Sequence, residues 1–151
     1  MPEKATGSTA RTVLAFDFGL QRIGVAVGEP EVGTAHPLPP LAAATQPGRF
    51  TAIEHLVKEW KPGLLLVGRP LGEDGVPHEM TRRAERFARQ LVGRFRLPVE
   101  LVDERYSSAE VESRMRASFG SRKAASLARG KKLDSHAAQI ILEQYFGDKT
   151  P

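Results

Sequence analysis

The chain has 151 residues, of which 40% are hydrophobic and 26% are charged, and its formal net charge is +4. There are no cysteines, which excludes disulfides, thiolate metal sites and cysteine nucleophiles. No apolar run approaches the roughly 18 residues of a membrane-spanning helix, and residues 1–8 lack the apolar stretch of a signal peptide. We therefore expect a cytoplasmic protein of one domain with no membrane partner, and its basic charge indicates a polyanionic partner.

The chain order predicts a folded domain over residues 12–147, between a disordered tail at 1–11 and a short C-terminal tail at 148–151. Alternating side chains predict a strand over 12–18, and a second strand over 23–27 completes a hairpin. A Pro- and Gly-rich stretch follows, in which we expect an irregular edge strand at about 35–41. The next segment, 49–60, has one apolar face and predicts a helix.

The second half of the chain alternates between strands and helices. We expect strands over 64–67 and 99–102, and helices over 79–95, about 107–117 and 133–146, the last of them ended by Gly147. An antiparallel start followed by alternating units predicts an α/β fold with a mixed sheet and helices on both faces.

Three carboxylates occupy positions where a packed domain does not favour them. Asp17 ends the first strand, Glu104 follows the strand at 99–102, and Asp134 opens the last helix. Buried carboxylates need a cation or a proton, and converging oxygen ligands suit Mg²⁺ or Mn²⁺. In a basic chain this combination indicates a metal-dependent nuclease.

Each carboxylate also has a structural interpretation. Asp134 fits the N-cap of the last helix, and Asp17 and Glu104 fit surface carboxylates or salt-bridge partners. Asp103 competes with Glu104, because neighbours on a strand point to opposite faces and only one of them can reach the site. The residues alone leave this choice open.

Basic residues gather in two segments. Residues 114–132 hold seven basic side chains and no acidic one, directly before Asp134, as a phosphodiester substrate requires. Residues 82–96 hold six arginines with only Glu85 among them, and this cluster fits a solvated helix face equally well.

Other chemistries find little support. The glycines after the first strand lack the spacing of a dinucleotide-binding fingerprint, there is no phosphate-loop lysine motif, and the four histidines lack metal-ligand spacing. The opening hairpin fits the phosphate hairpin of an actin-like ATPase, but that fold needs two lobes, and this chain supplies one.

Four segments carry a family resemblance. Residues 16–26 (FDFGLQRIGVA), 67–75 (VGRPLGEDG), 98–108 (PVELVDERYSS) and 131–138 (KKLDSHAA) resemble, in order, the motif blocks of the YqgF/RuvX family. The resemblance implies an RNase H-like fold, close to the Holliday-junction resolvases, over residues 12–147. It also implies that Asp17, Glu104 and Asp134 are the metal-binding catalytic residues, which favours Glu104 over Asp103. Two residues depart from the family pattern, Arg69 before a proline and Tyr106, and neither is a carboxylate.

The mechanism that the resemblance implies is phosphodiester hydrolysis with two Mg²⁺ or Mn²⁺ ions about 4 Å apart. One ion would activate water, the other would stabilise the leaving 3′ oxygen, and the product would carry a 5′ phosphate. Basic residues near the carboxylates are candidates to hold backbone phosphates, and we expect residues 118–131 to be mobile until substrate binds. These candidates are Arg22, Arg105, Lys123, Arg129, Lys131 and Lys132.

The same resemblance implies two alternative activities, maturation of the 5′ end of 16S ribosomal RNA and Holliday-junction resolution. We favour RNA processing, with structured RNA and ribosomal particles as partners, because a resolvase needs a dimer and no heptad seam or long apolar surface run predicts one. A monomer or weak dimer is expected. Two further alternatives are a non-catalytic nucleic-acid-binding module and a one-lobed ATP binder.

Overall fold

The computed structural model describes residues 11–71, 76–104 and 132–149, with the side chains of 132–134 and 148–149 excepted. Residues 1–10 of the expected tail at 1–11, the helix at about 107–117 and the mobile stretch at 118–131 lie outside these residues. Within them, no helix is long and apolar enough to cross a membrane.

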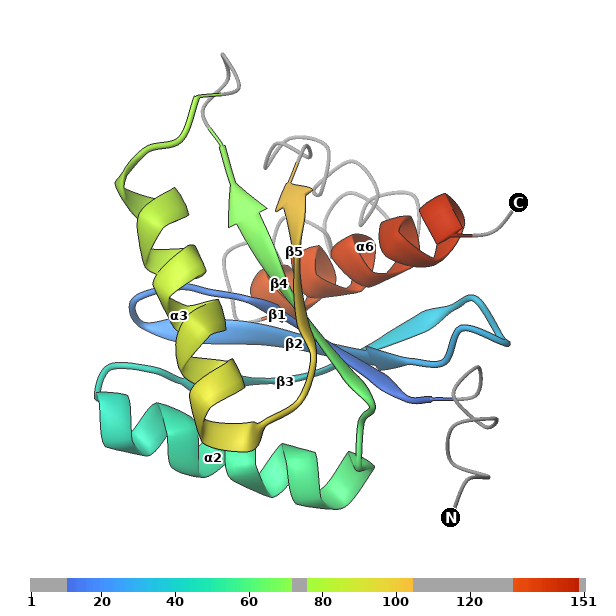
Figure 1. Cartoon of the computed structure of the whole chain (residues 1–151), viewed down its shortest axis with the longest axis horizontal. Helices are drawn as coiled ribbons and strands as arrows, with labels where there is room; N and C mark the ends of the chain where they lie inside the picture. The colour runs from blue at the N-terminus through green and yellow to red at the C-terminus, as the bar shows by residue number, and fades with distance from the viewer. Residues whose placement is uncertain (1–10, 72–75, 105–131, 150–151) are drawn as a thin grey trace.

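Five strands form one mixed sheet in the order β3-β2-β1-β4-β5 (Figure 1). β1 pairs antiparallel with β2, and β2 pairs antiparallel with β3, whereas β4 runs parallel to both β1 and β5. This arrangement confirms the predicted mixed sheet with an antiparallel hairpin at its start. The strands are β1 (Val13–Asp17), β2 (Arg22–Gly28), β3 (Ala35–Ala42), β4 (Leu64–Pro70) and β5 (Val99–Glu104).

Helices cover both faces of the sheet, as the sequence predicts (Figure 1). α2 (Gln46–Trp60) and α3 (Glu79–Phe95) pack on one face, around a core that includes Phe16, Phe50 and Phe87. α6 (Lys132–Lys149) crosses the other face, where Ala138, Leu142 and Phe146 are buried. Alternate residues of β1 therefore serve two separate cores, which explains why this strand is apolar on both sides.

Local side-chain contacts fix the beginnings of α2 and α3. Thr45 caps α2 by accepting a hydrogen bond from the Gly48 N–H at 3.2 Å, so the helix begins three residues before the predicted Arg49. His78 caps α3 by accepting from the Met80 N–H at 3.2 Å, while the Thr81 hydroxyl accepts from the His78 N–H at 3.0 Å. Neither cap was predicted from the sequence.

Three predicted elements are too short at their C-terminal ends. β4 continues past Val67 to Pro70 and β5 continues past Val102 to Glu104, because each strand completes the other's ladder as far as the Pro70–Glu104 pair. α6 runs through Gly147 to Lys149. Gly147 was expected to end this helix, but a glycine without a positive φ is compatible with a helix interior at a modest cost in stability.

Candidate active site

Asp17 lies at the C-terminal end of β1, on the face that α6 covers. Val13 and Ala15 are buried in the core beneath α6, and Leu14 and Phe16 point to the opposite core. Because side chains alternate along a strand, Asp17 follows Val13 and Ala15 onto the α6 face. There it is partly buried.

Glycines flank Asp17 on both neighbouring strands. Gly24 is its partner on β2. On the other side, Phe16 pairs with Val67 of β4, so the next residue, Gly68, lies beside Asp17. Neither neighbour has a side chain, which leaves the face beside the Asp17 carboxylate open to a group from elsewhere.

The Glu104 side chain occupies the space above Gly68. Along β5, Val102 packs in the core beneath α6, and Glu104 follows it onto the same face. A Cβ atom at Gly68 would lie 2.6 Å from Glu104 Oε2, which shows how closely the carboxylate approaches the β4 backbone. The absence of a side chain at this position therefore lets Glu104 reach across one strand towards Asp17.

Asp17 and Glu104 meet through a side-chain hydrogen bond. Burial raises the pKa of Glu104, because a charged carboxylate loses hydration there, and the hydrogen bond with Asp17 offsets part of this shift. Two carboxyl groups in contact repel each other when both are ionised, so the pair favours a shared proton or a cation. Carboxylate oxygens are ligands that divalent cations such as Mg²⁺ and Mn²⁺ prefer, and the residues present thus fit such an ion.

Asp103 points to the opposite face of the sheet. Its Oδ1 accepts a hydrogen bond from Arg69 Nη1 at 2.9 Å, and Arg69 Nε donates to Glu85 of α3 at 2.8 Å. These two carboxylates raise the pKa of Arg69 through their hydrogen bonds. Arg69 thus links β4, β5 and α3, which gives the unusual arginine a structural role and places Glu104, not Asp103, beside Asp17.

Asp134 belongs to the first turn of α6, but its side chain lies outside the described residues. The helix begins at Lys132, so the interpretation of Asp134 as an N-cap is wrong. Ala138 and Ile141, which share its helix face, are buried against the sheet, as their spacing predicts. In the described part of the chain, no three His, Cys, Asp or Glu side chains form a metal-binding group.

The neighbouring Ser135 fastens the start of α6 to the sheet. The register of β2 and β3 shifts between Ile23 and Val25. At this irregularity, the Ser135 hydroxyl accepts from the Val25 N–H at 3.4 Å and donates to the Leu38 carbonyl at 2.6 Å. Val25 adjoins Gly24, the partner of Asp17. Ser135 therefore holds the backbone of residue 134 near this part of the sheet.

The predicted phosphate-binding residues are only partly described. Arg22 is exposed at the start of β2, at the same end of the sheet as Asp17. Lys132 is in the first turn of α6, without a described side chain. The remaining candidates, Arg105, Lys123, Arg129 and Lys131, lie outside the described residues, as does Tyr106.

Gly24, Gly68 and Ser135 are parts of the site that were not predicted from the sequence. A glycine inside a strand often marks a close approach of another group, so Gly24 and Gly68 carried a usable signal. Ser135 carried none, because its partners Val25 and Leu38 are 110 and 97 residues away along the chain.

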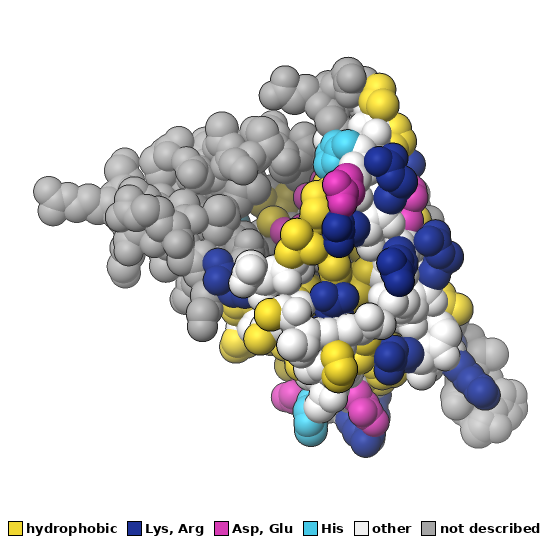
Figure 2. Space-filling view, turned by 90° about the vertical axis from the view of Figure 1, so that its left-hand side faces the viewer, with side chains coloured by type: hydrophobic (Ala, Val, Ile, Leu, Met, Phe, Trp, Pro, Cys, Tyr) yellow, Lys and Arg dark blue, Asp and Glu magenta, His cyan; other side chains and the backbone are white. Residues whose placement is uncertain are grey.

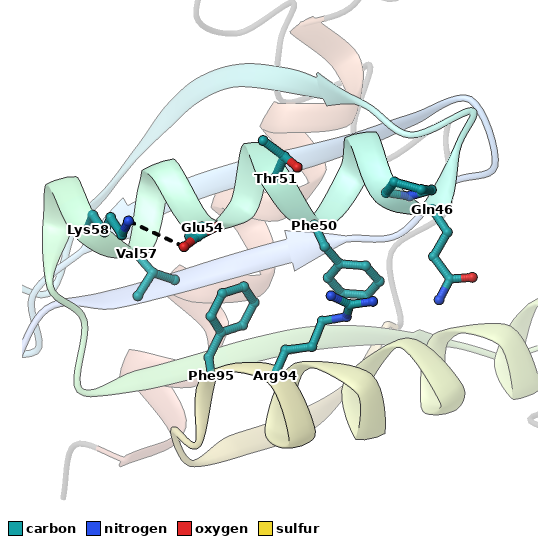
Figure 3. A pocket seen from close by; sticks show the side chains of 9 residues that line it. Gln46, Phe50, Thr51, Glu54, Val57, Lys58, Arg94 and Phe95 are labelled. Carbon is teal, nitrogen blue, oxygen red and sulfur yellow. Dashed lines mark ion pairs between the residues drawn. The ribbon is translucent and has the colours of Figure 1, made fainter.

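A groove of about 670 Å³ lies on the other face of the sheet, between α2 and the end of α3 (Figure 3). The Arg94 guanidinium lies over the Phe50 ring, 4.2 Å from its centroid, and a Glu54–Lys58 ion pair of 3.3 Å lies along α2. The sheet separates this groove from Asp17 and Glu104, so it is not part of the carboxylate site.

Comparisons with known proteins agree with the fold. The family model RuvX, described as Holliday junction resolvase, matches residues 11–148. A protein of Paraburkholderia xenovorans (strain LB400) named "Putative pre-16S rRNA nuclease" is 49% identical over 89% of this chain and 86% of its own length. A protein of the same name from Burkholderia lata (strain 383) is 47% identical over 93% of both chains.

Solved structures show the same architecture at low sequence identity. The Thermus thermophilus RuvC in complex with a Holliday junction substrate has a TM-score of 0.55 and 18% identity, and covers 92% of this chain and 95% of its own. The fowlpox virus resolvase in complex with Holliday junction DNA has a TM-score of 0.57 and 12% identity, and covers 93% of this chain and 99% of its own. These likenesses confirm the RNase H-like fold.

The five-stranded mixed sheet and the family match together identify a nuclease of the RNase H-like class. The chain belongs to the RuvX family, which matches it over nearly its whole length. Membership confirms the predicted family and the predicted enzyme class, hydrolysis of phosphodiester bonds in nucleic acid.

Proposed function

We propose that this nuclease matures the 5′ end of the 16S ribosomal RNA precursor in the cytoplasm, with Asp17, Glu104 and Asp134 as its metal-binding catalytic residues. The single observation that supports the site most strongly is the contact between Asp17 and Glu104 above Gly68. Two carboxyl groups from strands that are not neighbours meet in a partly buried place, where no described basic side chain forms an ion pair with Glu104.

The three carboxylates would hold one or two divalent cations, Mg²⁺ or Mn²⁺. Such an ion, when bound, supplies a nucleophile at neutral pH and neutralises charge on the phosphate. Asp17 and Glu104 come together because β1, β4 and β5 run parallel, so that β1 and β5 end on the same side of the sheet. Arg22 is exposed at this edge, and we propose that it holds a backbone phosphate, together with Arg105, Lys123, Arg129, Lys131 and Lys132.

RNA processing is favoured over junction resolution by the relatives. Proteins that are 46–50% identical to this chain carry the pre-16S rRNA nuclease name. The family description names a Holliday junction resolvase, and a junction-cutting DNA enzyme is therefore the second candidate function. The two differ in symmetry, because a resolvase cuts two strands related by a two-fold axis and acts as a dimer. For RNA processing we expect a monomer or weak dimer that acts on ribosomal particles.

The test is a cleavage assay with two substrates offered in parallel, a 16S precursor leader RNA and a four-way DNA junction. Each is incubated with Mg²⁺ or Mn²⁺ and with wild type, Asp17→Asn or Asp103→Asn. We expect metal-dependent cleavage of the RNA, its loss in Asp17→Asn and its retention in Asp103→Asn, whose carboxylate faces away from the site.

Other outcomes separate the alternatives. Selective cleavage of the junction, accompanied by a dimer mass in solution, would replace RNA processing with resolution. Metal-independent binding of both substrates without cleavage would support the non-catalytic binding module. Equal loss of activity in Asp17→Asn and Asp103→Asn would contradict the assigned carboxylates.

A further inference from the structure

The outer face of α3 carries a row of arginines. Arg82, Arg86 and Arg89 are all exposed. They follow one another at intervals of four and three residues, which places them on the same side of the helix. Figure 2 shows dark blue Lys and Arg side chains gathered on this side of the molecule. We call these three residues the arginine row.

Acidic side chains on α3 neutralise the arginine row only in part, through the electrostatic attraction between Glu79 and Arg82. Glu79 forms an ion pair with Arg83 at 2.7 Å, and Glu85 is bound to Arg69 at 2.8 Å. These are the only acidic residues of the helix. In the described part of the chain, no ion pair involves a member of the arginine row. Glu79 and Glu85 do lie one turn from members of the row. Their ion pairs are with Arg83 and Arg69, so the row keeps an excess of positive charge.

The arginine row begins near the end of the sheet where β1 and β5 finish with Asp17 and Glu104. The Thr81 hydroxyl donates a hydrogen bond to the carbonyl of Pro70, the last residue of β4. Pro70 pairs with Glu104 of β5. Arg82 is therefore the member nearest to the Asp17–Glu104 pair, and the row continues away from that edge along the helix (Figure 1).

We propose that the arginine row is a docking surface for the phosphate backbone of the nucleic-acid substrate, outside the cleavage site. From Arg82 to Arg89 the helix rises about 10 Å, which corresponds to roughly three phosphates of one strand. Arginine binds phosphate through a planar fork of donors without reading the bases. The row holds the part of the substrate that extends beyond the site, and so favours a structured nucleic acid over a short fragment. The identity of the ligand rests on the proposed nuclease function.

A binding assay without cleavage tests the docking surface. The probe is a fluorescein-labelled 16S precursor leader RNA, titrated in EDTA between 50 and 300 mM salt with the full-length protein. The test variant is Arg86→Gln/Arg89→Gln. The control, Lys58→Gln/Arg83→Gln, removes the same net charge from two exposed helix positions whose cations are already paired with Glu54 and Glu79. All four substitutions preserve helix propensity, and circular dichroism checks the fold.

We expect the test variant to bind roughly tenfold more weakly at 0.1 M salt and to lose about 1.5 from the slope of log affinity against log salt. The control is expected to change affinity less than threefold. Arg86→Lys/Arg89→Lys should recover most of the affinity, since lysine also neutralises a phosphate. Equal weakening in the test and control variants would reduce the effect to net charge and overturn the proposal, as would an unchanged salt slope.

The two proposals fail separately. If the test variant loses affinity but wild type cleaves neither substrate with metal, the docking surface stands and the nuclease assignment falls. If wild type cleaves the leader RNA and the test variant binds it normally, the nuclease assignment stands and the arginine row is a solvated helix face.

Discussion

The Glu104 carboxylate lies above the backbone of Gly68, in the place that the side chain of any other residue would fill. The contact joins the ends of β4 and β5 and brings Glu104 within hydrogen-bonding reach of Asp17 on β1. Gly68 is thus required for the approach of the two acidic groups, although it has no functional group itself.

Gly68→Ala should damage both packing and the site. The new Cβ would meet Glu104 Oε2 and Ile141 Cδ1, each at 2.6 Å, so one of these groups must move. We expect a loss of about 1–3 kcal/mol in unfolding free energy and a fall in Mn²⁺ affinity, measured by urea unfolding and calorimetric titration. Gly93→Ala is the control, because Gly93 is exposed on α3 and nothing lies within 4 Å of a Cβ added there. Gly93→Ala should stabilise the protein by about 0.5–1 kcal/mol. Unchanged Mn²⁺ affinity in Gly68→Ala would contradict the proposed role of Gly68 in positioning Glu104.

Stability without metal should fall as the pH rises through the range in which Glu104 ionises. Burial raises the pKa of Glu104 above its unfolded value, so between the two values the folded state binds more protons than the unfolded state. Unfolding free energy then decreases with increasing pH over that interval. Glu104→Gln cannot ionise, and we expect it to melt at a higher temperature than wild type near pH 7 and to lose this advantage near pH 4. Thermal melts in EDTA across that range give the comparison, and a variant less stable than wild type at pH 7 would refute the assignment.

Asp103 and Glu104 should differ sharply although they are adjacent. Asp103→Asn weakens the contact with Arg69 at 2.9 Å on the α3 face, so we expect a lower melting temperature with normal Mn²⁺ affinity. Glu104→Gln should give the reverse, a marked loss of Mn²⁺ affinity without loss of stability at neutral pH. Calorimetric titration of both variants decides, and a similar affinity loss in the two would show that the strand faces are misassigned.

Ser135→Ala should loosen the start of α6. It removes the hydroxyl between Val25 and Leu38, and leaves buried polar groups without that partner. We expect a loss of about 1–3 kcal/mol in unfolding free energy and, since Asp134 is the preceding residue, weaker Mn²⁺ binding. Gln139→Met is the matched control, because it removes another bond from α6 to β3, the 2.9 Å contact with the Ala35 carbonyl, one turn further along. Gln139→Met should lower stability without changing Mn²⁺ affinity. Equal Mn²⁺ affinities in Ser135→Ala and Gln139→Met would show that Ser135 does not support the metal site.

The class of fold and the family could be predicted from the amino-acid sequence. The continuous apolar run of β1 and the apolar faces of α2 and α3 depend on neighbours in the chain, so local pattern predicts them well. The same holds for the candidates Asp17 and Glu104, which stand directly at the ends of apolar strands. The predicted ends of helices and strands were less accurate. They depend on contacts that periodicity does not encode, namely the caps at Thr45 and His78 and the Pro70–Glu104 pairing.

Tertiary structure alone decided which groups meet. The choice between Asp103 and Glu104 required the face of β5 to be known, and that face is set by Arg69 on one side and by α6 on the other. Gly68 is part of the site only because β4 lies between β1 and β5 in the sheet. Sheet order and register depend on contacts between residues far apart in the chain, and such contacts leave no local periodicity in a single sequence.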